Sequence, residues 1–342
     1  MFETLDDFSR ALGRLPSSDP DARVLAETRQ ALLTKPAGAL GRLEDLAVFL
    51  AGWSTDGRPT IGEPVTIIFA GSHGVADQGV SAFPSEVTLQ MVANFESGGA
   101  AINAIAQSQG SRLEVIPLDL DVPTGDITQE EALGAEELLQ SLNAGANAVQ
   151  TANGVVALGE MGIGNTTIAA ALAASCFGGT GSDWAGPGTG LELDAVRRKA
   201  AIVDLALVRH RYSDTAVERL RCLGGREVAA IAGSIVAARH RRLPVLIDGF
   251  VVSAALAPLY RQNPAILEHC VAGHVSAEPA HARLLQEMRL RPLLDLSMRL
   301  GEGTGATLAL AVLKAAAASH NDMATFDEAA VSNRSSPTDK LS

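Results

Sequence analysis

Short runs of apolar residues alternate along most of the chain with longer stretches whose apolar positions have helical spacing. The short runs are rich in β-branched residues, which favour strands. They lie at residues 65–70, 114–118, 155–158, 245–247 and 270–272, with a shorter one near 293–296. The alanine-rich stretches between them predict helices at residues 85–107, 130–147, 166–176, 192–209, 226–239, 251–260 and 278–288. Strands that are apolar throughout are covered on both faces, so the pattern predicts an α/β fold with a doubly wound, mostly parallel, Rossmann-like sheet.

The two ends of the chain do not follow this alternation. Residues 1–55 predict helices alone, because "DARVLAETRQALLTK" and "LGRLEDLAVFLAGW" have helical apolar spacing and no strand lies between them. Near the other end, an alanine-rich helix is predicted at residues 304–318, before a polar segment. The expected division is a small helical domain made of residues 1–58 and 304–332, a large α/β domain at 59–303 that carries the active site, and a disordered tail at 333–342.

Composition and charge narrow the class of protein. The chain has 342 residues, of which 47% are hydrophobic, so it can bury a large aliphatic core. A net charge of −12 without a basic cluster argues against nucleic acid or a membrane as the main partner. The acidic start lacks the order of a signal peptide, and no apolar run reaches the roughly 18–20 residues of a membrane span. We therefore expect a cytoplasmic protein, in which Cys176, Cys222 and Cys270 are buried, reduced thiols.

Polar, glycine-rich segments follow the predicted strands. They read "GSHGVADQGVSAFPSEVTLQM", "DLDVPTGD", "GEMGIGNTT", "DGF" and "GHVSAEPAH" in chain order. Ligands of open parallel sheets bind beyond the carboxyl ends of the strands. These segments therefore predict a single cleft at that edge of the sheet.

Two glycine-rich loops suit a phosphate monoester. In "GEMGIGNTT", Gly162 and Gly164 let the backbone approach an anion, and the N-terminus of the following helix favours a phosphate. Asn165, Thr166 or Thr167 would cap that helix, but an ordinary capped turn would have the same sequence. The absence of GK[ST] excludes a nucleoside-triphosphate P-loop. The second loop is "GPGTGL" at residues 186–191, and Lys199 follows it on a helix.

Glu160 and Glu302 are carboxylates set among glycine and apolar or small residues. Such surroundings desolvate a carboxylate and raise its pKa towards that of a general base. Position alone leaves a structural role open for each residue. Glu302 would serve as a charge partner for the N-terminus of the helix beginning near Thr304, and Glu160 as a loop residue bonded to backbone N–H groups.

Several other polar residues follow strands. His73 and His274 have no spacing that matches a usual zinc site, so we expect turn or substrate-contacting histidines and no metal. Asp119, Asp121 and Asp248 would bond either backbone N–H groups or a ribose hydroxyl. The chain has no GxSxG, no Cys–His signature and no GxGxxG after the first strand, which argues against acyl-enzyme hydrolysis and hydride transfer.

Taken together, these segments resemble the nicotinate-nucleotide–dimethylbenzimidazole phosphoribosyltransferase family, which builds the lower-ligand nucleotide of cobalamin. The resemblance covers most of the chain and runs in order through "KPAGALGRLEDLA" (35–47), "HGVADQGVSAFPSEVTLQMVANF" (73–95), "GEMGIGNTTIAAAL" (159–172), "GPGTGL" (186–191), "PVLIDGFVVSAAL" (244–256), "GHVSAEPAH" (273–281) and "LSMRLGEGTGATLAL" (296–310). The chain departs from the family at Ser72, where Asp or Asn is frequent.

The resemblance implies a homodimer, each chain having a parallel-sheet domain and a small helical domain built from both termini. We expect no cofactor. It implies transfer of the 5-phosphoribosyl group of nicotinate mononucleotide to 5,6-dimethylbenzimidazole, with inversion at C1. Glu302 is then the catalytic base, and Glu160 lies beside the substrate. The residues implied for the phosphate are Gly162, Asn165, Thr166, Gly188 and Lys199, and those for the aromatic base are Phe83, Met91, Ser276 and Leu300.

Two alternatives remain at this stage. One is another glycosyl or phosphoribosyl transfer, for example from phosphoribosyl pyrophosphate, although the usual motif of two adjacent acids in an apolar strand is absent. The other is a non-catalytic sensor of benzimidazoles or ribotides. A sensor would need the pocket but not a base, so the presence of both Glu160 and Glu302 argues against it.

Overall fold

The structure is a computed structural model, and it describes residues 2–54, 56–188 and 190–332. The chain divides into two compact units. The larger unit comprises Met1–Ser17 and Gly62–Leu310, and the smaller unit comprises Ser18–Ile61 and Ala311–Ser342. The tail expected at 333–342 lies outside the described residues.

Five parallel strands form the central sheet of the larger unit within the described residues, in the order β3-β2-β5-β6-β7. They are β2 (Val65–Ala70), β3 (Arg112–Pro117), β5 (Val156–Met161), β6 (Val245–Ile247) and β7 (Cys270–Ala272). The chain places β3 on one side of β2 and then crosses to β5 on the other side, which is the doubly wound arrangement. The predicted fold class is confirmed.

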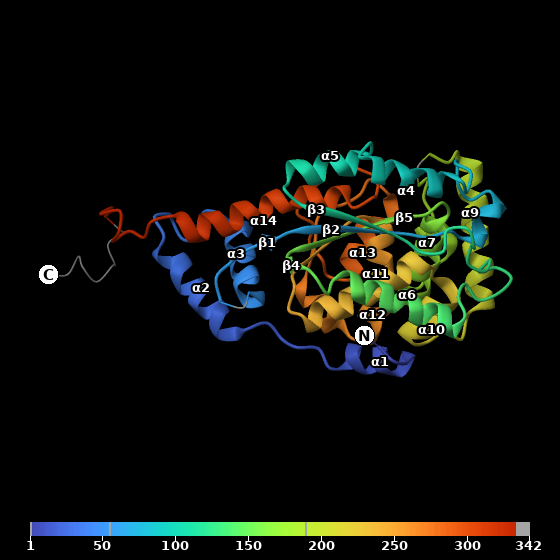
Figure 1. The fold of residues 1–342 in the computed structure, drawn as a ribbon, viewed down its shortest axis with the longest axis horizontal. Coiled ribbons are helices and arrows are strands. Elements are labelled where there is room, and N and C mark those ends of the chain that lie inside the picture. Colours follow the sequence, from blue (N-terminus) through green and yellow to red (C-terminus); the bar gives the residue numbers. More distant parts are fainter. Residues whose placement is uncertain (1, 55, 189, 333–342) are drawn as a thin grey trace. The chain divides into compact units, whose positions relative to one another are not determined.

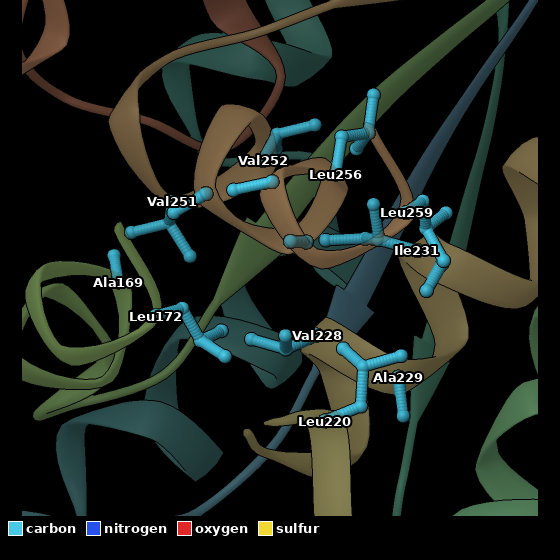
Figure 2. Packing of buried hydrophobic residues seen from close by; sticks show 14 of the residues in the cluster. Ala169, Leu172, Leu220, Val228, Ala229, Ile231, Val251, Val252, Leu256 and Leu259 are labelled. Carbon is cyan, nitrogen blue, oxygen red and sulfur yellow. The ribbon is translucent and has the colours of Figure 1, made fainter. Parts of the chain in front are cut away.

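Helices cover both faces of the sheet (Figure 1). One face packs against α6 (Ala135–Ala148), α7 (Asn165–Phe177), α11 (Arg226–His240) and α12 (Phe250–Gln262), and the other against α4 (Val87–Ser97) and α5 (Ala101–Ser108). Successive side chains of β2 point to opposite faces of the sheet. Ile67 and Phe69 pack in the hydrophobic core on the face covered by α6, α7, α11 and α12. Ile68 packs in a smaller core on the face covered by α4 and α5. Figure 2 shows apolar side chains of α7, α10 (Ala216–Leu223), α11 and α12 turned toward one shared space.

The remaining elements are shorter or lie outside the sheet. They are α1 (Leu5–Gly13), α8 (Gly181–Trp184), α9 (Leu193–Arg209), α13 (Pro279–Glu287), the 3-10 helices η1 (Gly74–Gln78) and η2 (Pro264–His269), and an antiparallel pair of β1 (Gly62–Glu63) with β4 (Asn153–Gly154). The smaller unit contains α2 (Pro20–Leu32), α3 (Arg42–Trp53) and the later part of α14 (Thr304–Asp322). Among the described residues, no helix combines the length and apolarity needed to cross a membrane.

Several local predictions differ from the structure. The helix expected at 85–107 is two helices, because Gly98 takes a left-handed φ of 82° and ends α4. The strand expected near 293–296 is wrong, since only Leu294 forms an isolated bridge, to His274. The helix α1 lies in the larger unit because Phe8 and Leu12 join its main core, and α14 begins in that unit as well.

Glycines allow α6 and α11 to touch backbone to backbone. A Cβ built at Gly145 of α6 would lie 1.7 Å from the carbonyl oxygen of Ala230, and one built at Gly233 of α11 would lie 1.9 Å from that of Leu142. A packed interior cannot absorb such an overlap without moving the helices. The close contact therefore sets the distance between α6 and α11, which cover one face of the sheet.

We expect Gly233→Ala to lower the free energy of unfolding, measured by urea denaturation, by at least about 1–3 kcal/mol because it overpacks the α6–α11 contact. Gly13→Ala is the matched control, since no heavy atom of the described residues lies within 4 Å of a Cβ there beyond its chain neighbours. The control should stay within about 0.5 kcal/mol of the unsubstituted protein. Equal stability of the two variants would contradict the account.

Candidate active site

A cleft lies beyond the carboxyl ends of β5, β6 and β7, with an empty volume of about 640 Å³ that includes its open mouth. The structure brings eight of the predicted residues to its lining. Glu160, Glu302, Ser276 and Leu300 line it, as do the four residues Gly162, Asn165, Thr166 and Gly188 that were expected at a phosphate.

Three predicted residues do not line the cleft. Lys199 is fully buried behind the lining, where its Nζ donates to Thr166 Oγ1 at 2.7 Å and to the Gly186 carbonyl at 3.2 Å. Phe83 precedes α4 and is 48% exposed. Met91 lies on α4 and packs against the cluster of Ile68 on the other face of the sheet. Phe83 and Met91 do not line this cleft, and their contacts with an aromatic ligand stay predictions.

The turn that carries Glu302 has an unusual backbone. Gly301, Glu302 and Gly303 have φ values of 84°, 60° and 74°, so all three are left-handed. Glycine adopts this conformation freely, but in glutamate it costs roughly 1–2 kcal/mol. A Cβ built at Gly159 of β5 would lie 2.4 Å from the Gly303 nitrogen, so only glycine there lets the turn rest on the strand. Glu160 is the next residue of β5, which puts the two glutamates at one wall of the cleft.

Asp248, just after β6, anchors the same turn. Its Oδ2 accepts the N–H of Gly303 at 3.1 Å and its Oδ1 accepts the N–H of Ala306 at 2.9 Å, so this buried carboxylate caps α14. His274 Nε2 lies 3.4 Å from Oδ1. Burial acts to raise the pKa of Asp248, but His274 and the N–H bonds outweigh it and leave the pKa lowered. The helix-terminus role that the sequence left open for Glu302 is therefore filled by Asp248.

Glu160 and Glu302 hold their protons at higher pH than ordinary glutamates. Burial raises the pKa of Glu302 to about 7, and the charge of Asp248 adds to the effect. Burial raises the pKa of Glu160 to about 8, with the charges of Asp248 and Glu227 adding, although the Asn165 amide donates to Oε2 and opposes the shift. Both groups are thus placed to exchange protons near neutral pH.

The two glycine-rich loops meet at the other side of the cleft. Gly164 has a φ of 95° and caps α7, whose first turn carries Thr166. A Cβ built at Gly188, which has a φ of 54°, would lie 3.3 Å from Thr166 Oγ1 and 3.7 Å from Lys199 Nζ. Burial lowers the pKa of Lys199 to about 8, while the charge of Glu278 acts against the shift. A helix N-terminus, two glycine loops and a buried amine therefore converge on one point.

Sequence reasoning missed two charged residues of the lining. Glu278 Oε2 accepts the N–H of Gly188 at 3.1 Å, and Arg299 Nη1 donates to the carbonyl of Gly188 at 3.2 Å. Their only signal in the sequence is their place within "GHVSAEPAH" and "LSMRLGEGTGATLAL".

The polar residues around His73 have structural contacts. His73 Nε2 and Glu227 Oε1 lie 2.8 Å apart in a fully buried pair, and Ser72 Oγ donates to the Leu120 carbonyl at 2.8 Å. His274 lines the cleft. No group of three or more His, Cys, Asp or Glu side chains in the part of the chain that the structure describes is placed to hold a metal ion.

Comparison with known proteins gives consistent matches. A family described as Phosphoribosyltransferase matches residues 15–331. A protein of Novosphingobium aromaticivorans named nicotinate-nucleotide–dimethylbenzimidazole phosphoribosyltransferase is 54% identical, over 97% of this chain and 98% of its own length. A protein of the same name from Ruegeria sp. is 52% identical, over 96% and 98%. The crystal structure of the protein of that name from Thermus thermophilus has a TM-score of 0.86 at 38% identity and covers 92% of this chain and 100% of its own.

The raised pKa of Glu160 predicts how stability depends on pH. The folded protein keeps the proton up to about pH 8, whereas an ordinary glutamate loses it near 4.5. The folded state therefore binds more protons in this interval, and its stability falls as pH rises. We expect the free energy of unfolding of Glu160→Gln, minus that of the unsubstituted protein, to increase by up to about 1.4 kcal/mol per pH unit from pH 5 to 8.

Titrating groups that do not interact with Glu160 are common to both proteins and cancel in this difference. Glu96→Gln, at an exposed glutamate of α4, is the control and should give a difference that does not vary with pH. Urea denaturation at a series of pH values measures both differences. A flat difference for Glu160→Gln would show that the carboxyl ionises normally in the folded state.

Proposed function

The chain belongs to this phosphoribosyltransferase family, which it matches over residues 15–331, and we propose that it transfers the 5-phosphoribosyl group of nicotinate mononucleotide to 5,6-dimethylbenzimidazole. The products are nicotinate and α-ribazole 5'-phosphate, a nucleotide for cobalamin biosynthesis. The names of relatives more than half identical to this chain support the choice of substrates. The observation that carries the proposal is a cleft with two buried, high-pKa carboxylates at one wall and two glycine loops at the other.

The chemistry requires one base. Nicotinate leaves C1 of the ribose as a neutral pyridine ring, so its departure needs no general acid. One nitrogen of the benzimidazole attacks C1, while the N–H of the other becomes acidic as charge develops. Glu302 accepts this proton, and its pKa of about 7 suits a base that works near neutral pH. Holding the N–H also fixes the tautomer whose free lone pair faces C1.

Glu160 acts on the electrophile. The pyridinium of the donor is positively charged, and positive charge builds up on the ribose as the bond to nicotinate breaks. A cation in the cleft favours the ionised form of Glu160, and the resulting carboxylate stabilises this charge in a site with little water. Displacement in line with the departing ring inverts C1, which converts the β-nucleotide into an α-riboside.

The glycine loops anchor the donor through its phosphate. Gly162, Asn165, Thr166 and Gly188 line that side of the cleft, where the N-terminus of α7 favours an anion. Lys199 supplies positive charge from behind Thr166. Ser276 and Leu300 line the space left for the benzimidazole.

The assembly and location of the enzyme are also part of the proposal. We propose a homodimer, in which a second copy would cover exposed apolar side chains such as Leu296 and Leu300, which are 58% and 48% exposed. Cys176, Cys222 and Cys270 are free and buried, which suits the reducing cytoplasm.

One assay tests the function. Nicotinate mononucleotide and dimethylbenzimidazole are mixed with and without the protein, and nicotinate and α-ribazole 5'-phosphate are followed by chromatography. We expect the protein to release both products in equal amounts. Binding of the two compounds without release of nicotinate would contradict transfer and would instead indicate a sensor.

We expect Glu302→Gln to lower kcat by about 10²–10⁴-fold, because it removes a positioned base. The Kd for nicotinate mononucleotide should stay the same, since the donor is held by the glycine loops. In the unsubstituted enzyme kcat should rise with pH through about 7, as Glu302 loses its proton, and the variant should lack this rise. Measurements of kcat from pH 5.5 to 8.5 check both points, and unchanged turnover in Glu302→Gln would remove this residue as the base.

A further inference from the structure

The buried carboxylate of Glu278 lines the part of the cleft that the proposed function assigns to the donor's phosphate. The inference below rests on that assignment. Glu278, the N-cap residue of α13, is 5% exposed and lines the cleft. Its Oε2 accepts the N–H of Gly188 at 3.1 Å. The carboxylate is thus bonded to a backbone N–H of the loop expected to face the phosphate.

The position of Glu278 is built into the loop. A Cβ at Gly186 would lie 2.0 Å from Oε1 of Glu278, so glycine at 186 is needed for the carboxylate to lie against the loop. Oε1 is buried and has no hydrogen-bond partner among the described residues. Oε1 of Glu278 is therefore free to form a hydrogen bond with a ligand in the cleft.

Two cations face Glu278 from neighbouring segments. They are Lys199 of α9 and Arg299 of the segment before α14, and both favour the ionised carboxylate, as does the Gly188 N–H. On its own helix, His281 is engaged elsewhere, because its Nδ1 accepts the N–H of Ser276 and its Nε2 pairs with Ser253 Oγ at 2.9 Å. Burial outweighs the cations and raises the pKa of Glu278.

A phosphate dianion bound beside Glu278 would favour the protonated form of its carboxyl. It would bring two negative charges next to a carboxylate that is shielded from water, and a carboxyl with like charges beside it takes up a proton. The protonated carboxyl has an O–H to donate, and phosphate oxygens are strong acceptors. The buried and unpaired Oε1 is the atom available to carry this proton.

We propose that Glu278 holds the Gly188 N–H in the unliganded enzyme and takes up a proton from solvent when the donor's phosphate binds, so that it donates a hydrogen bond to the phosphate. Phosphate binding and protonation of Glu278 are then linked. Affinity for a phosphate-bearing ligand falls as pH rises, because the proton becomes harder to acquire.

Calorimetric titration with ribose 5-phosphate, which has the phosphate but no leaving group, tests the linkage. The binding enthalpy is measured from pH 6 to 8 in buffers of different ionisation enthalpy, which gives the number of protons taken up. We expect Glu278→Gln to take up fewer protons than the unsubstituted protein, by up to about one. Because Lys199 interacts with the charge of Glu278, the same comparison is made in a Lys199→Met background, in which this amine contributes no proton. Relative to the variant, the unsubstituted protein should lose up to about tenfold in affinity per pH unit.

Glu287→Gln is the control, because Glu287 is an exposed glutamate at the end of the same helix, and it should match the unsubstituted protein. Infrared difference spectra give a second measurement that needs no substitution at Glu278. Adding ribose 5-phosphate should produce the C=O band of a protonated carboxyl both in the unsubstituted protein and in Glu302→Gln, because Glu302, with a pKa of about 7, would otherwise be a second source of the band. Equal proton uptake in Glu278→Gln, no such band, or no binding of ribose 5-phosphate would overturn the proposal.

The outcome is separable from that of the proposed transfer reaction. Nicotinate release together with equal proton uptake in Glu278→Gln would reject the role of Glu278 and keep the transferase. Linked binding of ribose 5-phosphate without nicotinate release would reject the transfer and support the linkage at this subsite.

Discussion

The close approach of the Glu302 turn to β5 is the constraint on which the cleft depends. It exists because Gly159 has no side chain, and because Asp248 holds the turn from the end of β6 through the N–H groups of Gly303 and Ala306. The same approach starts α14 against the sheet. Further along the same edge, Gly273 lets Ala306 lie against the end of β7. The cleft is therefore shaped by backbone contacts between strands and one helix end.

This arrangement buries acidic groups of identical chemistry in different environments. Asp248 receives two N–H bonds and a nearby histidine, so its pKa is lowered and it stays ionised. Glu160 and Glu302 have fewer compensating bonds, and the charge of Asp248 adds to their burial. One anchoring carboxylate thus does two things. It fixes the geometry of the turn, and its charge adds to the burial that raises the pKa values of Glu160 and Glu302 into the neutral range.

Much of this was predictable from sequence, for physical reasons that also explain the rest. Strands β2, β6 and β7 have the predicted bounds because they are short and apolar, and the glycine-flanked Glu160 and Glu302 are distinctive in any reading. The break between α4 and α5 depends on the φ of Gly98, which periodicity does not reveal. Glu278 looked like an ordinary N-terminal helix residue, and its place in the cleft depends on contacts with Gly186 and Gly188 that are distant in the sequence. The spacing of apolar residues predicts where helices and strands lie, but which residues a side chain contacts is decided by the tertiary structure.

At Glu302, selection for stability and selection for a proton-accepting side chain would favour different residues, because its backbone is left-handed. Asparagine or glycine fits a φ of 60° with less strain than glutamate does, so selection for stability alone would replace this residue. Neither replacement could take a proton from a substrate. The strain at this position is therefore a cost that the proposed role as a base would account for, and a search for more stable variants that ignores activity would be expected to discard the glutamate.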